Sequence, residues 1–591
     1  MGTTIQRLIP MALSLTLVGA CGGVKADAEK NARKAGSSGL ETDIQQIVQN
    51  RTPPDYVTRD PEGTRLWKQT RAFYEKRSFD AAWIEDGAPR GQMDAFIKAI
   101  HAASAEGLDP ELYSASMLDA RRHEASKGFL TKKGFEAHEA TSMDVWLTWL
   151  FLKYASDLAD GISDLAHSDP KWQIKPEAFD ALAHLESALG NNRVEQALLD
   201  LVPDNPEYEA LKKALASYRQ IAAKGGWPRV PAAATAKLKP GQASPLVPAL
   251  AARLAATGDY SGAVPPDGRP AAYGPELQDA VKRFQRRHGL EDDGIVGGPT
   301  VAELNVPIEA RIRQIEMNME RWRWLPRVLG DRYVLVNIPE MRLDVREGGR
   351  VPLSMRVVVG KPDTPTPIFN DQMTHVVFAP YWNVPPNIAE KETMPSIMRD
   401  PAFLDRMNME VVDAKGNPVD PGSVDLENPG EYRVRQRPGT SNALGLVKFM
   451  FPNQFDVYLH DTPVDSLFAR ASRSFSHGCV RVEQPEELAR YVLRDQPEWT
   501  PEKISEAMHA GHEQTVKLKE AIPVYLGYWT ARVTPDGILQ FRKDVYGIDT
   551  RLGTKLTERL DRMRQSARSA ETTVAAPEPK PEKASKRDKR K

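Results

Sequence analysis

Residues 41–230 carry apolar side chains at the spacing of α-helices. In one stretch they recur every three to four positions and would share one helical face: Met93, Phe96, Ile97 and Ile100. Residues 146–152, Trp-Leu-Thr-Trp-Leu-Phe-Leu, are apolar on nearly all sides, as expected for a helix buried inside a bundle. The pattern predicts a helical domain over residues 41–230.

A second group of helices, shorter and closely spaced, is predicted over residues 246–306. Residues 231–245 are rich in Ala, Pro and Lys and predict a linker ahead of them. The string LQDAVKRFQRRHGLEDDGIVGGPTVAEL resembles the three-helix peptidoglycan-binding domain of many cell-wall enzymes. The resemblance implies a tether to the wall rather than a catalyst, and the alternative is a generic helical hairpin.

From residue 331 to about 548 the apolar pattern is that of β-strands. Short β-branched or alternating runs predict strands at 333–338, 341–345, 353–359, 375–378 and 455–459. Residues 388–432 interrupt this pattern with a predicted helix at 400–407 and little strand character. Such an insertion is either a lid over a binding site or a plain decoration. The whole chain is therefore expected to be a multidomain α+β protein.

The two ends of the chain differ from the rest. Residues 1–21 resemble a signal peptide that ends in a bacterial lipobox, Leu-Val-Gly-Ala-Cys, so Cys21 is the expected lipidation site. Residues 22–40 are small and polar, as in a tether, and Gly22 resembles signals that send lipoproteins to the outer membrane. A plain cleaved signal is the alternative. Residues 565–591 lose apolar content and predict a disordered basic tail.

Composition narrows the class of protein. At 591 residues the chain should split into three or four domains, and a net charge of −1 gives no overall basic footprint for nucleic acid. The chain has two cysteines. Export with lipidation or cleavage at Cys21 would leave Cys479 without a disulfide partner, so this thiol is expected to be either buried or used.

Cys479 lies in the sequence Ser-His-Gly-Cys, nineteen positions after His460. A free thiol is mostly protonated at neutral pH, so we expect a nearby base or positive charge, such as His460, to ionise it. Gly478 permits a tight turn whose backbone amides could donate to an oxyanion. The strand predicted at 455–459 would end at His460. The fifteen residues between His460 and Ser476 are enough for the chain to form a loop and return alongside that strand. These are the ingredients of a Cys–His acyl-transfer site.

The motifs HDTP and SHGCVRV, with fifteen residues between His460 and Ser476, resemble the signature of L,D-transpeptidases of the YkuD fold. The resemblance extends over residues 331–548, and the order of the three domains is similar to large Gram-negative members. It implies that Cys479 is the nucleophile and His460 the general base and acid. It also implies that Asp461 orients the imidazole through its carbonyl. The expected oxyanion donors are the amides of His477, Gly478 and Cys479, with the hydroxyl of Tyr458.

The resemblance implies further roles and a substrate. The residues expected to shape the pocket or contact substrate are Ser476, Arg481, Tyr381, Trp382 and Asn383. The substrate would be the peptidoglycan stem peptide, joined in 3→3 crosslinks through a cysteine thioester, with no cofactor. Water as acceptor would give an L,D-carboxypeptidase, and a protein lysine would give attachment of that protein to the wall. The site would also be a carbapenem target.

Two other classes of function remain open. A zinc site could use Cys and His, but no CxxC, HxxE or HExxH accompanies the motif. A non-catalytic lipoprotein could anchor the wall through the three-helix module and a lipid alone. The expected location is the periplasm, tethered to the outer membrane, or else soluble or held at the inner membrane. The sequence leaves the oligomeric state open.

Overall fold

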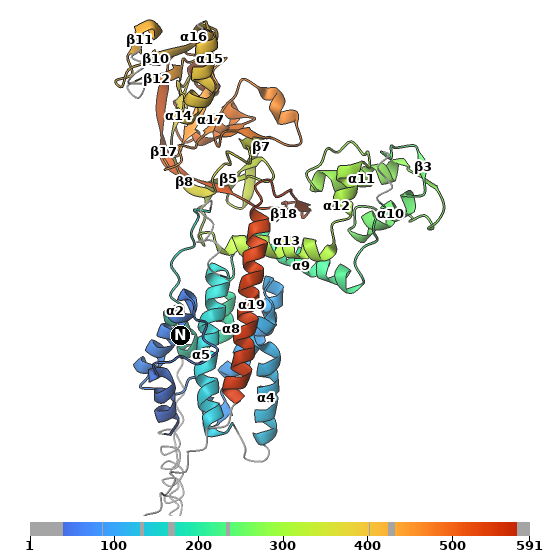
Figure 1. The fold of residues 1–591 in the computed structure, drawn as a ribbon, viewed down its shortest axis with the longest axis vertical. Helices are drawn as coiled ribbons and strands as arrows, with labels where there is room; N and C mark the ends of the chain where they lie inside the picture. Colours follow the sequence, from blue (N-terminus) through green and yellow to red (C-terminus); the bar gives the residue numbers. More distant parts are fainter. Residues whose placement is uncertain are drawn as a thin grey trace, which may run out of the picture.

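The computed structural model describes residues 39–85, 87–129, 135–162, 172–231, 237–400, 402–423 and 432–575. A helical bundle forms the lower part of the molecule, a β-rich domain lies above it, and a small helical module stands to one side (Figure 1). The expected multidomain α+β organisation is confirmed. Cys21 and the rest of the predicted signal and tether up to residue 38 lie outside the described residues.

The bundle surrounds one long central helix, α5 (Ala137–Asp160). Trp146, Leu150 and Phe151 on this helix are all buried, as the apolar pattern predicted. Other helices of this region pack around it: α2 (Pro61–Lys76), α3 (Gly91–Ala102), α4 (Ala115–Phe129), α7 (Ala181–Gly190), α8 (Val194–Leu199) and α9 (Pro206–Ala223). A buried carboxylate fixes one loop of the bundle, because Asp144 accepts hydrogen bonds from the backbone N–H groups of Trp83 and Ile84.

The prediction of a disordered tail from residue 565 is wrong over its first part. Helix α19 (Ile548–Ala575) leaves the β-rich domain and runs down along the bundle beside α5 (Figure 1). Residues spaced along one stripe of α19 are buried there: Met563, Ser566, Ala570 and Val574. They are small or apolar at three- to four-residue spacing, so the helix packs despite its polar composition. Residues 576–591 lie outside the described part of the chain.

The module consists of three helices, as expected: α10 (Val247–Ala256), α11 (Pro275–Arg287) and α12 (Gly298–Leu304). Its core begins earlier than predicted. Val230 and Leu238 are buried with the module's apolar side chains, and Leu238 bridges to Val296. Strands β3 (Ala243–Ser244) and β4 (Ala271–Ala272) also pair. The described end of the predicted linker is therefore part of the module, because the apolar Leu238 side chain is buried in the module's core and its backbone bridges to Val296.

The β-rich domain is built on a nine-stranded sheet in the order β15-β7-β16-β14-β13-β8-β17-β5-β6, and pairing of β6 with β7 closes it on itself. The strands are β5 (Arg332–Asn337), β6 (Arg342–Glu347), β7 (Arg350–Gly360), β8 (Phe369–Phe378), β13 (Val447–Met450), β14 (Leu459–His460), β15 (Ser474–Ser476), β16 (Val480–Val482) and β17 (Gln514–Gly527). Flanking elements are α13 (Ile308–Arg323), α17 (Pro485–Val492), α18 (Pro501–Met508), β18 (Ala531–Val533) and β19 (Leu539–Phe541).

The expectation of little strand structure in the insertion is wrong. The insertion has its own four-stranded sheet, in the order β11-β10-β12-β9, and a small core that includes Leu404, Met409 and Val411. Its elements are β9 (Trp382–Asn383), α14 (Pro386–Ile388), a π-helical turn η3 (Ala389–Thr393), α15 (Met394–Arg399), α16 (Phe403–Arg406), β10 (Met409–Val412), β11 (Pro418–Val419), η4 (Pro421–Ser423) and β12 (Arg433–Gln436). The insertion therefore begins at residue 382 and ends at 436.

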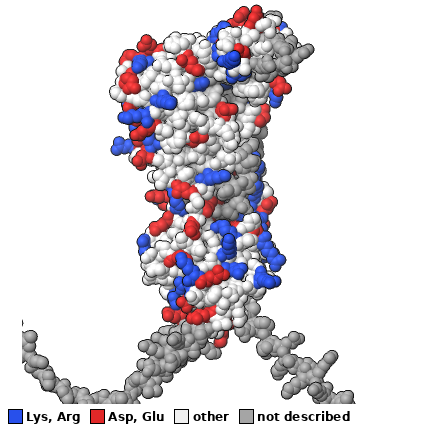
Figure 2. Space-filling view, turned by 90° about the vertical axis from the view of Figure 1, so that its left-hand side faces the viewer, with Lys and Arg blue, Asp and Glu red and all other residues white. Residues whose placement is uncertain are grey.

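Charge is mixed on the face of the molecule shown in Figure 2, where Lys/Arg and Asp/Glu side chains are interspersed and neither sign forms a continuous track. No helix within the described ranges combines the length and apolar character that a bilayer crossing requires.

Candidate active site

His460 and Cys479 are brought together by a parallel strand pair. In β14 and β16, Leu459 lies opposite Val480 and His460 opposite Arg481. Because side chains alternate between the two faces of a sheet, His460, Cys479 and Arg481 share one face. The strand predicted at 455–459 is reduced to Leu459–His460. The preceding residues form a turn, in which the side chain of Asn453 accepts from the backbone N–H of Phe455.

Gly478 shapes the turn in front of Cys479. Its φ of 126° lies in a region that side-chain-bearing residues rarely adopt. Two hydroxyls hold this turn, since Thr366 Oγ1 donates to the carbonyl of Gly478 at 2.8 Å and Ser476 Oγ to that of Cys479 at 2.6 Å. Ser476 Oγ also accepts from the Gly478 N–H at 3.1 Å. The Gly478 amide, expected as an oxyanion donor, is therefore already engaged.

Two other amides of the turn remain available. Within the described residues, the backbone N–H groups of His477 and Cys479 have no hydrogen-bond partner. Such unpartnered donors beside a nucleophile have the character of an oxyanion hole.

The thiol of Cys479 is half-buried and lies against the turn that precedes β14. Its sulfur is 3.8 Å from the carbonyl oxygen of Asp456. Burial raises the pKa of the thiol above its ordinary value, while hydrogen bonds from the backbone and hydroxyl of Tyr458 and the charge of Arg481 act in the opposite direction. Burial and the nearby sulfur likewise raise the pKa of the Tyr458 hydroxyl. Tyr458 thus lies beside the sulfur as a hydrogen-bond donor.

The His460 imidazole is 4% exposed and is oriented by the next residue in the chain. Its Nδ1 lies 2.6 Å from the carbonyl oxygen of Asp461, which fixes the tautomer with the proton on Nδ1. The Asp461 carboxylate accepts from the backbone N–H groups of Leu446 and Thr462 and so holds this corner in place. Burial, followed by the charge of Arg481, lowers the pKa of His460 to about 3.

These pKa shifts differ from the expectation of an ionised resting thiol. The thiol is protonated because its pKa is raised, and the imidazole is neutral because its pKa is lowered. The physical reason is burial, which disfavours both members of a thiolate–imidazolium pair. At neutral pH both groups are therefore uncharged.

The other predicted residues are distributed between the site and the insertion. His477 is exposed, and its Nε2 lies 2.9 Å from Glu392 of the π-helical turn in the insertion. Trp382 and Asn383 form strand β9, which pairs with β12 of the insertion. The Tyr381 ring lies under the guanidinium of Arg435, 4.2 Å away. Throughout the described ranges, no hydrogen bond or ring contact joins Tyr381, Trp382 or Asn383 to Cys479 or His460.

Sequence reasoning did not single out Lys448 or Thr366. Lys448 lies opposite His460 on β13, on the side away from Arg481. The run Val-Lys-Phe-Met shows the ordinary alternation of a strand with one buried face, so no local signal distinguished Lys448. In the part of the chain that the structure describes, no group of three or more His, Cys, Asp or Glu is placed to hold a metal ion.

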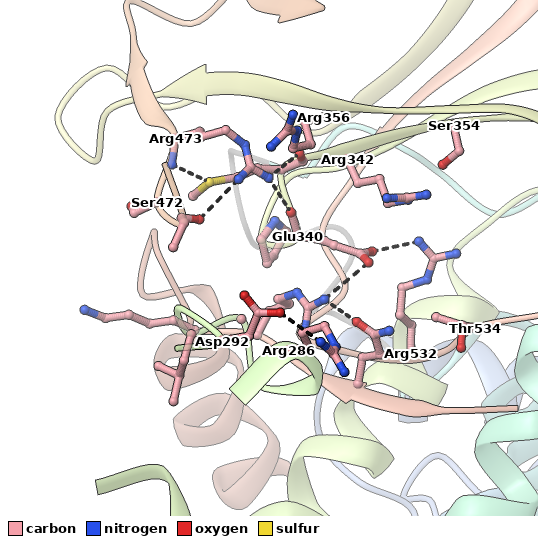
Figure 3. A pocket seen from close by; sticks show the side chains of 18 of the residues that line it. Arg286, Asp292, Glu340, Arg342, Ser354, Arg356, Ser472, Arg473, Arg532 and Thr534 are labelled. Carbon is pink, nitrogen blue, oxygen red and sulfur yellow. Dashed lines mark hydrogen bonds and ion pairs between the residues drawn. The ribbon is translucent and has the colours of Figure 1, made fainter. Parts of the chain in front are cut away.

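A cleft of about 950 Å³ lies between the module and the β-rich domain (Figure 3). Arg473 occupies its upper wall and donates to the backbone carbonyls of Val357 and Met341. Glu340 and Arg532 form an ion pair across its centre at 2.7 Å. Arg473 directly precedes β15, so these bonds fix the loop that leads into Ser476 and Cys479.

Three family models match the chain. The L,D-transpeptidase catalytic domain model (YkuD) matches residues 331–507, the model described as "Putative peptidoglycan binding domain" matches residues 243–304, and a "Scaffold domain" model matches residues 68–215. Strand β17 lies beyond the first match, yet it pairs with β5 and β8 inside the sheet. The domain in this chain is therefore larger than the matched segment.

A Haemophilus influenzae protein named "Putative L,D-transpeptidase" is 34% identical over 257 residues, which are 43% of this chain and 50% of that protein. The chain thus spans about half the length of this relative. An L,D-transpeptidase structure from Xylanimonas cellulosilytica is 18% identical, and the match covers 51% of this chain and 98% of that one, with a TM-score of 0.17. An L,D-transpeptidase structure from Mycobacterium smegmatis is 15% identical, and the match covers 33% of this chain and 58% of that one, with a TM-score of 0.16. These TM-scores are too low to carry any conclusion about this chain.

Proposed function

We propose that this chain is a cysteine-dependent acyltransferase that forms 3→3 crosslinks between peptidoglycan stem peptides, as the match of residues 331–507 to the L,D-transpeptidase catalytic-domain model supports. The observation that carries the proposal is the parallel pairing of β14 with β16, which sets His460 on the same sheet face as Cys479. The match of residues 243–304 to a peptidoglycan-binding model supports the wall as the substrate.

In the acylation step the sulfur of Cys479 attacks the carbonyl carbon of the third stem residue. His460 accepts the thiol proton at Nε2, since its Nδ1 proton is held by the Asp461 carbonyl. The carbonyl oxygen becomes an oxyanion, for which we assign the backbone N–H groups of His477 and Cys479 as donors. Collapse breaks the peptide bond, and the terminal D-alanine leaves as an amine that takes the proton from His460. The product is a thioester.

In the second step a side-chain amine of a neighbouring stem attacks the thioester. His460 takes a proton from this amine and returns it to the departing sulfur, which restores the neutral thiol and imidazole. Water in place of the amine gives an L,D-carboxypeptidase, and a protein lysine gives wall attachment of that protein. The three outcomes share the thioester, so the acceptor decides between them.

To test the proposal, the full chain is incubated with disaccharide-tetrapeptide, and the reaction products are identified by mass spectrometry. We expect 3→3-linked dimers with the native chain and none with Cys479→Ala, because the alanine cannot form the thioester. Tripeptide alone would indicate hydrolysis. If a folded chain gave neither product and formed no carbapenem adduct at Cys479, the enzymatic proposal would be wrong and a wall-anchoring role would replace it.

A periplasmic location follows from the proposed substrate. We further propose that lipidation of Cys21 tethers the protein to the outer membrane, which fits the sequence pattern before this residue. Labelling with a radioactive or clickable fatty acid tests this, with Cys21→Ser as the control.

A further inference from the structure

Two cations flank the imidazole in one row of the sheet. The cross-strand register places Lys448 of β13 opposite His460 and places Arg481 of β16 opposite it on the other side. Directly paired residues point to the same face, so all three side chains project toward the face that carries Cys479. Two strand spacings separate the backbones of Lys448 and Arg481 by roughly 10 Å.

Lys448 has one loosely held counter-charge, Glu513, and Arg481 has none among the described residues. The nearest carboxylate to Lys448 Nζ is that of Glu513 at 3.8 Å, which is beyond ordinary hydrogen-bond length. Arg481 forms no ion pair with any described residue, and its Nε is buried without a hydrogen-bond partner. Partly buried cations of the same sign are costly unless an anion completes the site. The anion that would pair with Arg481 and bond Lys448 more closely than Glu513 does is therefore expected to come from the ligand.

We infer that Lys448 and Arg481 together bind the terminal carboxylate of the acyl donor, which makes Lys448 a specificity-determining residue that the sequence motif does not include. The inference rests on the proposed acyl-transfer function. In a tetrapeptide this carboxylate belongs to the residue directly after the scissile carbonyl. Arg481 lies two residues after Cys479 on an extended strand, about 6 to 7 Å along it, which is within reach of the long Arg and Lys side chains.

This placement selects donor length as well as charge. In a pentapeptide the carboxylate is one residue further from the scissile carbonyl, by about 3.8 Å. With the scissile carbonyl of a pentapeptide at the Cys479 sulfur, the terminal carboxylate would therefore lie beyond Lys448 and Arg481. A tetrapeptide with a free carboxylate is thus the donor that fits. A tetrapeptide amide lacks only the charge of that carboxylate and keeps every other contact.

The test compares the tetrapeptide acid with the tetrapeptide amide as donors. A hydrogen-bonded carboxylate contributes about tenfold to hundredfold, so we expect the native chain to prefer the acid by that factor in kcat/KM. Lys448→Met should lose most of this preference, because it lowers kcat/KM for the acid far more than that for the amide; any effect of the lost charge on His460 acts on both donors alike. Lys448→Arg should keep the preference. Lys517→Met, an exposed lysine on the same face of the sheet, is the matched control and should match the native chain.

Binding to the Cys479→Ala chain, measured by calorimetry, separates recognition from chemistry. There the acid should bind about tenfold or more tightly than the amide, and Lys448→Met should remove the difference. Equal affinity for the two peptides, or an equal loss on both in Lys448→Met, would overturn the inference. The proposed function would survive this result as long as the native chain acylates both donors. Turnover of neither donor would instead overturn the proposed function.

Discussion

Replacing Thr366 with valine removes one hydroxyl that serves two backbone groups around the catalytic turn. Thr366 is 2% exposed. Its Oγ1 donates to the carbonyl of Gly478 and accepts from the N–H of Gly360 at 2.9 Å. Valine has a similar shape but leaves both groups buried without a partner, since no water can replace a hydroxyl that a methyl group has displaced.

The magnitude follows from those two groups. Each buried polar group left unsatisfied costs about 1–3 kcal/mol, so the lower bound for the pair is about 2 kcal/mol. For a domain of this size each 1 kcal/mol lowers Tm by roughly 2–4 °C, which gives a decrease of roughly 4–8 °C. Release of the Gly478 carbonyl should also displace the adjacent Cys479, and we expect kcat/KM to fall about tenfold or more.

Three measurements test this prediction. Hydrogen exchange of peptides that cover residues 474–482 reports on the turn, thermal unfolding gives Tm, and tripeptide release gives kcat/KM. Thr366→Ser is the matched control, because it keeps the hydroxyl and loses one methyl group worth about 0.8 kcal/mol. The serine chain should exchange and react nearly as the native chain does. If the valine chain kept native exchange, native Tm and native kcat/KM, the hydroxyl would not be what holds this turn.

Two further predictions concern acid stability and the long helix. Because His460 has a folded-state pKa of about 3, the unfolded chain binds more protons between roughly pH 6.5 and 3, so stability should fall as pH falls through that window. Denaturant unfolding at several pH values should show this, with a smaller slope in His460→Gln; an unchanged slope would refute it. Ala570→Asp places a charge in the buried face of α19 and should destabilise the bundle by about 3 kcal/mol or more, whereas exposed Arg568→Asp should change thermal unfolding little. Equal Tm values for these two variants would contradict the packing of α19.

The placement of His460 beside Cys479 could be predicted from sequence because local signals agree there. The alternating runs at 333–345 and the spacing between His460 and Cys479 are both short-range patterns, and the strands form where those runs predict them. Lys448 could not be identified in this way. Its meaning depends on the register between β13 and β14, which joins residues on different strands and is set by packing of the whole sheet.

The insertion and the long helix were misjudged for a different reason. Met409–Val412 is too short and too close to turn residues to stand out, and it becomes a strand because β12 and β11 pair with its two edges. Residues 565–575 were predicted to be part of a disordered tail because charged and small residues dominate this segment. Their burial depends on a groove formed by helices some 400 residues earlier in the chain.

The course of α19 ties the beginning of the described chain to its end. Arg559 pairs with Asp60 at 3.0 Å, and Ser566 donates to the carbonyl of Tyr56. During synthesis from the amino end, the other helices of the bundle are complete at Ala223, and α19 begins only at Ile548, so one side of the bundle would stay uncovered while the chain between them is made. A product interrupted before residue 548 would leave apolar side chains of α5 uncovered, and such surfaces attract proteases. We therefore expect the helical bundle to reach its full stability only after the chain beyond residue 548 has been made.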